Sequence, residues 1–188
     1  VSEVELHQLI QDEFSGVDVL VCANLPDYIT SPVIMKLLEE KLPVEALTVM
    51  VQKEAAVRIC AAPGTRACGA VSVAVQYYSQ PQILFDVPRD CFFPAPNVDS
   101  AVIRLNIRKE PPVKLETEEK QFFKLVKAAF GQRRKTVLNS LNTGLGKSKE
   151  ELSAALQQAG IAPTARAEQL TMEQFGTLCN LLFPNKTK

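Results

Sequence analysis

The sequence predicts an α/β fold in two parts: a sheet with helices over residues 1–110 and a small all-helical domain over 113–188. In the first part, apolar runs of strand length alternate with stretches of helical apolar spacing. The second part contains only helical patterns, several of them with start or stop signals. Between the two, Pro111-Pro112 follows a charged run, and consecutive prolines cannot extend a strand ladder. This dipeptide therefore marks a linker.

The first part opens with a helix and a strand. Apolar residues recur at helical spacing over 2–13 behind Ser2, and 17–23 is apolar almost throughout, as in a buried strand. Ser31-Pro32 predicts an N-cap followed by proline at the first helical position, with the helix running to about Lys41. Further along, the sequence predicts a strand over 47–51, a helix over 53–62 stopped by Pro63-Gly64, and an antiparallel strand pair over 83–87 and 101–107. Residues 69–79 are ambiguous, because alternating valines there also suit a strand.

The second part carries the signals of a helical domain. Helices are expected near 117–130, 134–142, 149–159 and 172–183. Ser148-x-x-Glu151 and Thr171-x-x-Gln174 have the form of capping boxes, and Gly160 is placed to end the third helix.

The loop over residues 24–32 is the candidate active site. It follows the apolar run 17–23, and ligands of open α/β sheets bind outside the carboxyl ends of the strands. The amide oxygen of Asn24 and a backbone carbonyl near Pro26 can together accept both hydrogens of an exocyclic amine. Such a grip aims the amine's lone pair at an electrophilic methyl group. The plainer alternative is that Asn and Pro simply form a turn.

Composition excludes several other functions. The chain is 46% hydrophobic and 22% charged, with neither an apolar run long enough to span a membrane nor a visible signal peptide, which predicts a soluble cytoplasmic protein. The five cysteines include no Cys-x-x-Cys pair, so they are expected to be buried or incidental thiols, with no metal site. A single histidine, His7, is assigned a structural role, which disfavours hydrolase chemistry.

Charge is segregated along the chain although the net charge is zero. Residues 120–149 hold eight basic residues and no acidic one, against 13 basic and 21 acidic residues elsewhere. Such a run is often only a solvated helix face. Here it includes a cluster beside a glycine, with Thr136 and Asn139 as neutral phosphate-binding groups, so we interpret it as a contact to an RNA backbone. The RNA-binding residues expected are Lys127, Gln132, Arg133, Arg134 and Lys135.

The loop over residues 24–32, Asn-Leu-Pro-Asp-Tyr-Ile-Thr-Ser-Pro, resembles the catalytic motif of adenine-N6 methyltransferases. It is closest to the form found in the KsgA/RsmA family of small-subunit ribosomal RNA adenine-N6,N6-dimethyltransferases. Further stretches resemble that family in the same order: Met-Val-Gln-Lys-Glu-Ala-Ala-Val-Arg at 50–58, Pro-Gly-Thr-Arg-Ala-Cys-Gly-Ala-Val-Ser-Val-Ala-Val-Gln at 63–76, Phe-Phe-Pro-Ala-Pro-Asn-Val-Asp-Ser-Ala at 92–101, Phe-Gly-Gln-Arg-Arg-Lys-Thr at 130–136 and Arg-Ala-Glu-Gln-Leu at 166–170. The resemblance thus covers nearly the whole chain.

The resemblance implies a fold and a reaction. Residues 1–110 would be the C-terminal half of a Rossmann-like methyltransferase sheet, 69–79 a helix, and 113–188 the RNA-binding helical domain. The complete enzyme would transfer methyl groups from S-adenosyl-L-methionine to N6 of two adjacent adenines near the 3′ end of 16S ribosomal RNA. The substrate would be a nearly assembled 30S particle, which gives the protein a role in ribosome biogenesis.

The resemblance also assigns roles to individual residues. Asn24, with the backbone of Leu25 and Pro26, would hold the amine, and Asn24 would also border the cofactor. Tyr28 would line the pocket, and Phe92 would flank the base, where aromatic stacking is worth about 1–3 kcal/mol. The neighbouring Phe93 is expected in the core, and Asp99-Ser100 is expected to turn the chain into the last strand.

One position departs from the family motif. Asp27 stands where the family carries the aromatic residue that stacks on the adenine, and a carboxylate cannot stack as a ring does. Four interpretations of Asp27 remain open: a natural divergence with a reduced rate, an inactive assembly factor, an engineered change and a sequence error.

The glycine-rich cofactor loop of such enzymes is not found upstream of the Asn-Leu-Pro motif. We therefore expect the chain to be a C-terminal portion, inactive by itself, that lacks the cofactor-binding half. Strand 17–23 would then have an open edge, which predicts self-association, strand exchange or a retained N-terminal piece.

Two other classes of function remain. The chain can be a non-catalytic RNA-binding module that assists ribosome assembly. Less favoured is a DNA-binding relative of the same fold, because the basic segment lacks a recognisable DNA-reading motif.

Overall fold

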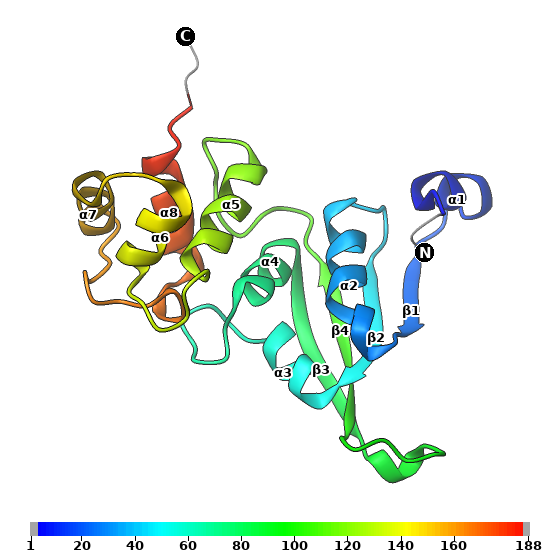
Figure 1. Ribbon diagram of the computed structural model, residues 1–188. Coiled ribbons are helices and arrows are strands. Elements are labelled where there is room, and N and C mark those ends of the chain that lie inside the picture. Colours follow the sequence, from blue (N-terminus) through cyan, green and yellow to red (C-terminus); the bar gives the residue numbers. More distant parts are fainter. Residues whose placement is uncertain (1–3, 186–188) are drawn as a thin grey trace. The chain divides into compact units, whose positions relative to one another are not determined.

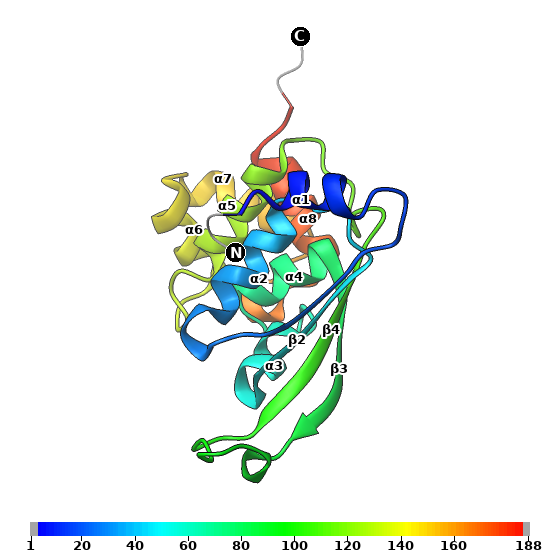
Figure 2. The ribbon, with the colours of Figure 1, turned by 90° about the vertical axis from the view of Figure 1, so that its right-hand side faces the viewer.

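The structure is a computed structural model that describes residues 4–185, shown in two views in Figures 1 and 2. The chain divides into two compact units. The first contains residues 1–60 and 75–110, and the second contains 61–74 and 111–188. The boundary at 110/111 coincides with the proline pair, whereas the inclusion of 61–74 in the second unit departs from the expected 1–110 division.

The first unit is built on a four-stranded mixed sheet in the order β1-β2-β4-β3. Its strands are β1 (Leu20–Asn24), β2 (Ala46–Gln52), β3 (Ser79–Val87) and β4 (Ser100–Ile107). Strands β1 and β2 are parallel, and the pairs β2/β4 and β3/β4 are antiparallel. The helices are α1 (Leu6–Glu13), α2 (Thr30–Glu39), α3 (Lys53–Ile59) and α4 (Ala70–Tyr78), the last of which crosses the division between the units.

The core of the first unit lies around the two central strands. Alternate residues of β4 are buried, Ala101, Ile103 and Leu105, and β2 buries Leu47, Val49 and Val51. Helix α3 packs against β2, β3 and β4. The buried side chains of α2 and α3 complete this core: Ile34, Leu37, Leu38, Ala56 and Ile59.

The two outer strands differ from their predicted bounds because each is an edge of the sheet. The strand expected over 17–23 forms only from Leu20 to Asn24, and none of its residues is buried; Leu20 is 60% exposed. The prediction of a buried strand is therefore wrong, whereas the expected open edge is present. Strand β3 begins at Ser79 rather than at 83 and includes Pro81, whose missing N–H is tolerated on an edge strand.

Two helix boundaries also differ from prediction. Helix α2 begins at Thr30, after a 3₁₀ turn over Asp27–Ile29, so Ser31 is not its N-cap. Pro32 is the third helical residue, where its missing N–H is one that the helix leaves unpaired in any case. Helix α3 ends at Ile59, before Pro63-Gly64. The ambiguous stretch 69–79 forms helix α4, as the family resemblance implied. The expected cap Ser2 lies outside the described residues.

In the second unit, the regular elements of the described residues from 111 onward are all helical. They are α5 (Glu119–Ala129), α6 (Val137–Leu145), α7 (Lys149–Gln158) and α8 (Met172–Leu182), with a 3₁₀ turn at Ala167–Gln169. Helix α5 packs on α6 and α8, and α7 packs on α6 and α8. The fully buried large side chains of this core are Phe122, Leu125, Leu141, Leu152, Leu156, Leu170 and Phe175.

Capping sets the helix bounds of the second unit. Thr171 and Gln174 form the predicted reciprocal capping box, and Gly160 follows α7 with φ +68°. Ser148 caps α7 by accepting from the backbone N of Glu151, whose carboxylate pairs with Lys147 instead. The helix expected over 134–142 begins at Val137, because Thr136 is its N-cap and accepts from the backbone N of Asn139 at 3.4 Å. The basic residues 133–135 therefore lie in a loop.

Candidate functional site

Three neighbouring strands bring polar residues to one edge of the sheet. Asn24 is the last residue of β1 and is level with Met50 of β2. Gln52, the last residue of β2, is level with Ser100, the first residue of β4. The parallel strands β1 and β2 thus end where the antiparallel strand β4 begins. This edge is the position at which open α/β sheets bind ligands.

A cavity of about 180 Å³ lies at this edge. Its lining combines the strand ends with two loops: Asn24, Leu25, Met50, Val51, Gln52, Phe92, Pro96, Val98 and Ser100. Amide and hydroxyl groups face it from the strand ends, and apolar side chains face it from the loop after β3. A cavity of this composition suits a flat, largely apolar group that carries a few hydrogen-bonding atoms.

The backbone of the Asn-Leu-Pro loop is partly engaged within the chain. The carbonyl oxygen of Pro26 accepts from the hydroxyl of Thr30 at 3.1 Å and from the backbone N of Ile29 at 3.1 Å. A carbonyl has two lone pairs, so both acceptor positions of Pro26 are filled. The sequence reasoning left the acceptor as the Leu25-Pro26 backbone. With the Pro26 carbonyl already engaged, the prediction of an amine-holding loop rests on the carbonyl of Leu25 and the side-chain oxygen of Asn24.

The two residues after Pro26 lie in the 3₁₀ turn Asp27–Ile29. Tyr28 is 84% exposed and is not among the residues that line this cavity, so its place beside a bound base stays a prediction. Asp27 is placed in the same turn by its backbone.

The loop after β3 presents its two phenylalanines differently. Phe92 is half-buried and lines the cavity together with Pro96 and Val98, and its contact with a base stays a prediction. Phe93 is fully exposed at 103%, so its predicted place in the core is wrong. The backbone at Phe92 is extended, with φ −115° and ψ 151°, and successive side chains of extended backbone point to opposite sides. Burying one ring therefore exposes the other.

Polar contacts at both ends hold this loop. The carboxylate of Asp99 accepts from the backbone N of Arg89 at 2.9 Å, and the backbone N of Lys53 donates to the carbonyl of Asp99 at 3.0 Å. Asp99 thus turns the chain into β4, as expected. Lys53 Nζ also pairs with Asp86 at 2.6 Å, and that hydrogen bond, with the charges of Asp86 and Asp99, raises the pKa of Lys53.

In the second unit, the predicted RNA-binding residues are exposed. Gln132, Arg133, Arg134 and Lys135 form the loop between α5 and α6, and Lys127 is on the last turn of α5. The hydroxyl of Thr136, expected to bind phosphate, already accepts its N-cap hydrogen bond. Among the described residues, no carboxylate forms an ion pair with Arg133, Arg134 or Lys135, so this cationic loop can meet an anionic partner.

The structure adds Arg166 to this cationic surface. The backbone N of Val137 donates to the carbonyl of Ala165 at 2.8 Å, which brings the exposed Arg166 beside the start of α6. The sequence reasoning noted the stretch 166–170 but gave Arg166 no role. Arg166 is 31 residues from Lys135 in the chain, so the sequence does not show that the two lie close together. The only sign of a role for Arg166 in the sequence was that residues 166–170 resemble the family. We call Arg133, Arg134, Lys135 and Arg166 the cationic patch.

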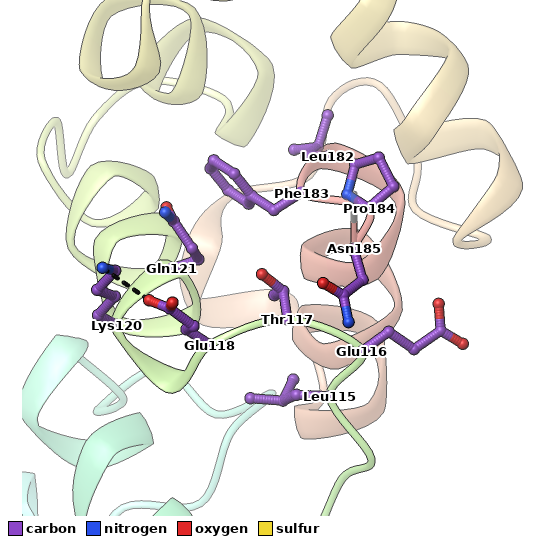
Figure 3. A pocket seen from close by; sticks show the side chains of 10 residues that line it. All are labelled: Leu115, Glu116, Thr117, Glu118, Lys120, Gln121, Leu182, Phe183, Pro184 and Asn185. Carbon is purple, nitrogen blue, oxygen red and sulfur yellow. Dashed lines mark ion pairs between the residues drawn. The ribbon is translucent and has the colours of Figure 1, made fainter. Parts of the chain in front are cut away.

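A larger cavity of about 650 Å³ lies between the start of α5 and the end of α8 (Figure 3). Its lining mixes charges: Leu115, Glu116, Thr117, Glu118, Lys120, Gln121, Leu182, Phe183, Pro184 and Asn185. Lys120 pairs with Glu118 at 2.7 Å, drawn as the dashed line in Figure 3. With two glutamates and a neutralised lysine, this cavity is unsuited to a phosphate backbone.

The remaining chemically active residues are structural or dispersed. His7 Nε2 lies 2.6 Å from the carbonyl of Glu40, which agrees with a structural role. All five cysteines are free, Cys68 and Cys179 buried and Cys22 and Cys91 exposed, which is consistent with the expected buried or incidental thiols. Across residues 4–185 the His, Cys, Asp and Glu side chains form no group able to hold a metal ion, and no helix could cross a membrane.

Comparisons with known proteins agree with this geometry. A family described as ribosomal RNA adenine dimethylase matches residues 4–183. The chain is 50% identical over 186 residues to ribosomal RNA small subunit methyltransferase A of Geobacillus sp. (strain WCH70). It is 52% identical over 179 residues to the protein of that name from Alkaliphilus metalliredigens. The alignments cover 97% and 95% of this chain, but it spans only 64% and 62% of the length of those relatives.

Solved structures show the same fold at lower identity. A dimethyladenosine transferase from Plasmodium falciparum superposes with a TM-score of 0.69 at 24% identity, covering 88% of this chain and 66% of that one. The 23S rRNA methyltransferase ErmE gives a TM-score of 0.62 at 22% identity, covering 94% of this chain and 78% of that one. These likenesses support the α/β methyltransferase fold.

Proposed function

The chain belongs to the ribosomal RNA adenine dimethylase family, and from that premise we propose that it provides the adenine-holding site and the RNA-binding surface of an rRNA adenine-N6 methyltransferase. The observation that carries this proposal is the cavity at the strand ends, where Asn24 and Leu25 at the end of β1 meet Phe92 from the loop after β3. The substrate we propose is adenine in small-subunit ribosomal RNA, dimethylated at N6 on the 30S particle during ribosome biogenesis. The proposed place of action is the cytoplasm.

The residues of the cavity account for the binding of an amine. The side-chain oxygen of Asn24 and the carbonyl of Leu25 would accept the two hydrogens of the exocyclic amine, since Pro26 has no acceptor position left. Held in this way, the nitrogen lone pair points away from both acceptors, toward an incoming methyl group. Phe92 would flank the base, and Val98 and Pro96 would exclude water from its edge. Orientation and desolvation are therefore what this chain contributes to the reaction.

The cavity fits the base and not a whole nucleotide cofactor. Its volume of about 180 Å³ lies below the roughly 300–1,000 Å³ typical of sites that enclose such ligands. Asn24, exposed at the end of an edge strand, is the residue of this chain that would border S-adenosyl-L-methionine. That group, when bound, supplies an activated methyl that requires no nucleophile from the protein.

The second unit supports the RNA part of the proposal. The cationic patch and Lys127 are exposed, and phosphate contacts of this kind position a protein on RNA without reading its sequence. Specificity for one adenine would then come from the cavity, and affinity from the patch. Because the two functions lie on different units, variants can separate them.

A second function is favoured by one residue. Asp27 occupies the position at which the family motif has an aromatic ring, and without that ring one face of the base is left unstacked. A protein that binds the small subunit and assists assembly without methylating it would be consistent with Asp27. Loss of catalysis with retention of binding would identify this function.

The test is transfer of labelled methyl from S-adenosyl-L-methionine to undermethylated small ribosomal subunits. We would compare the chain itself with a chimera that adds the part of the Geobacillus relative's length that this chain does not span. We expect the chimera to be active and Asn24→Ala to reduce its activity about 100-fold or more, because an unheld amine is misplaced. Restoring the ring with Asp27→Tyr should raise turnover. A chimera that binds subunits but transfers no methyl, with or without Asp27→Tyr, would support the assembly function instead.

A further inference from the structure

Phe93 is a fully exposed aromatic ring beside the adenine-holding cavity. It is 103% exposed, while Phe92 directly before it and Pro96 three residues after it line the cavity. A single exposed apolar side chain needs no explanation by itself. Phe93 differs from such an isolated side chain because the backbone at Phe92 is extended. The rings of Phe92 and Phe93 therefore point to opposite sides of the loop, one toward the cavity and one toward solvent.

The loop presents Phe93 on an anchored support. Its start is held by the hydrogen bond from the backbone N of Arg89 to the carboxylate of Asp99, and its end by the bond from Lys53 to the carbonyl of Asp99. Asp86, at the end of β3, is paired with Lys53. A ring on such a loop loses little conformational freedom on binding, which is a condition for a stacking surface of useful affinity.

We propose that Phe93 is a second stacking platform, which takes the nucleotide next to the base held in the cavity. This inference rests on the proposed function, because it presumes that a base of single-stranded RNA enters the cavity beside Phe92. Any such base has covalently linked neighbours, and drawing it out of the stack unstacks at least one of them. The exposed ring of Phe93, the residue after Phe92, offers a surface on which such an unstacked neighbouring base can stack.

The two phenylalanines then have separate roles. Phe92 contacts the reacting base, whereas Phe93 is a positioning residue that fixes the flanking nucleotide and so the depth to which the reacting base enters. Stacking on an aromatic ring tolerates any base. Phe93 should therefore favour an ordered neighbour without selecting its identity.

The test is a double-mutant cycle between protein and RNA that requires no catalysis. The probe is a fluorescent RNA hairpin with the target adenine in its loop, and its binding to the full chain is measured by anisotropy at constant salt. Abasic sites are placed in turn at the target position and at each of its two neighbours. Phe93→Ala should weaken binding of the intact hairpin about 5- to 100-fold, which corresponds to about 1–3 kcal/mol of stacking on one base.

The coupling pattern decides the result. Phe93→Ala should have no further effect when one particular neighbour is abasic, and Phe92→Ala should have no further effect when the target itself is abasic. Phe85→Ala is the matched control, because Phe85 is an exposed phenylalanine of β3, at 57%, outside the cavity lining. It should leave the affinity unchanged with every probe.

The failures of the two ideas differ. If Phe92 couples to the target but Phe93 couples to neither neighbour, the platform is disproved and the adenine site stands. If Phe92 does not couple to the target either, the proposed function loses its site. An equal loss of affinity on Phe93→Ala for every probe would show that the ring maintains the loop and contacts no base, which also overturns the platform. Phe93→Trp, which keeps an aromatic face, should retain the coupling.

Discussion

Lys53 Nζ lies 2.6 Å from a carboxylate oxygen of Asp86, and this pair joins the first residue of α3 to the end of β3. Both side chains are about half exposed, at 51% and 50%. Exposed pairs contribute little to global stability. The position of this one is more informative, since the same lysine bonds through its backbone N to Asp99 and so anchors the loop that carries Phe92 and Phe93.

The Lys53–Asp86 pair predicts a local effect of charge reversal. Lys53→Glu would place three carboxylates together, with Asp86 and Asp99, and their repulsion should loosen the loop. We expect faster hydrogen exchange at the backbone amides of residues 89–92, with a nearly unchanged melting temperature. The double variant Lys53→Glu/Asp86→Lys restores an opposite-charge pair and should return exchange to the original rate. Equal exchange in all three proteins would show that the pair does not hold the loop.

The cationic patch predicts the salt dependence of RNA binding. Each phosphate contact contributes about −0.7 to −0.9 to the slope of log affinity against log salt concentration. Changing Arg133, Arg134 and Lys135 together to Gln should reduce the magnitude of this slope by about 2 to 3, and Arg166→Gln by about 1. Lys36→Gln, which removes a charge paired with Glu40 on α2, is the control. A slope unaffected by Arg166→Gln would remove that residue from the patch.

The close packing of Gly144 against Ala128 predicts that the contact between α5 and α6 does not tolerate a larger side chain at position 144. A Cβ built at Gly144 would lie 2.7 Å from the Cβ of Ala128 and 3.0 Å from its Cα, so an added methyl group forces the helices apart. We expect Gly144→Ala to lower the free energy of unfolding by about 1–3 kcal/mol, measured by urea denaturation. Thr143→Ala, at an exposed neighbouring position, is the control. Adding Ala128→Gly removes the nearest clashing atom and should recover part of the loss.

The thiols predict how stability depends on pH. Burial raises the pKa of Cys60, Cys68 and Cys179 from 9.0 to about 11. Between pH 9 and 11 the unfolded chain therefore loses thiol protons that the folded chain retains. Because the unfolded state is then the better acid, the free energy of unfolding should fall as pH rises through this range, and be unaffected by these groups below pH 9.

The same burial pattern predicts thiol reactivity. At pH 8, iodoacetamide should modify the exposed Cys22 and Cys91 quickly and the other three slowly, as measured by mass spectrometry of peptides. In Cys179→Ala the fall in stability above pH 9 should become shallower. Rapid modification of Cys179 in the native protein would contradict its burial.

Strand β1 predicts a self-association that remains a proposal. Its outer edge has unpaired backbone groups, and Leu20 is 60% exposed, both of which favour pairing with another strand. Antiparallel pairing of two copies of Leu20–Asn24 would be centred on Cys22 and bring the two thiols opposite each other. In Cys91→Ser, mild oxidation should yield a Cys22-linked dimer, and Leu20→Lys should reduce it. A chain that light scattering shows to be monomeric, and that does not cross-link, would exclude this pairing.

The sequence by itself determined those elements whose signals are local. Helical apolar spacing and side-chain caps located α5, α7 and α8, and the Thr171/Gln174 capping box formed as predicted, because its two hydrogen bonds join residues three apart. The family resemblance also placed Phe92 near the Asn-Leu-Pro loop, and in the structure Phe92 lines the same cavity as Asn24 and Leu25. These inferences hold because neighbours in the chain, or a whole motif, carry the information.

Tertiary structure decided what depends on neighbours distant in the chain. Only the strand order showed that β1 is an edge, so an apolar run that suits a buried strand is exposed at Leu20. Only the hydrogen bonds from Ile29 and Thr30 showed that the carbonyl of Pro26 is already engaged within the chain. The hydrogen bond between the backbones of Val137 and Ala165 brings Arg166 close to the rest of the cationic patch. Phe93 faces solvent because the side chain of Phe92, on the opposite side of the extended backbone, lines the cavity. In each case the environment of a residue depends on contacts with groups distant in the sequence, and these contacts form only when the chain packs into its tertiary structure.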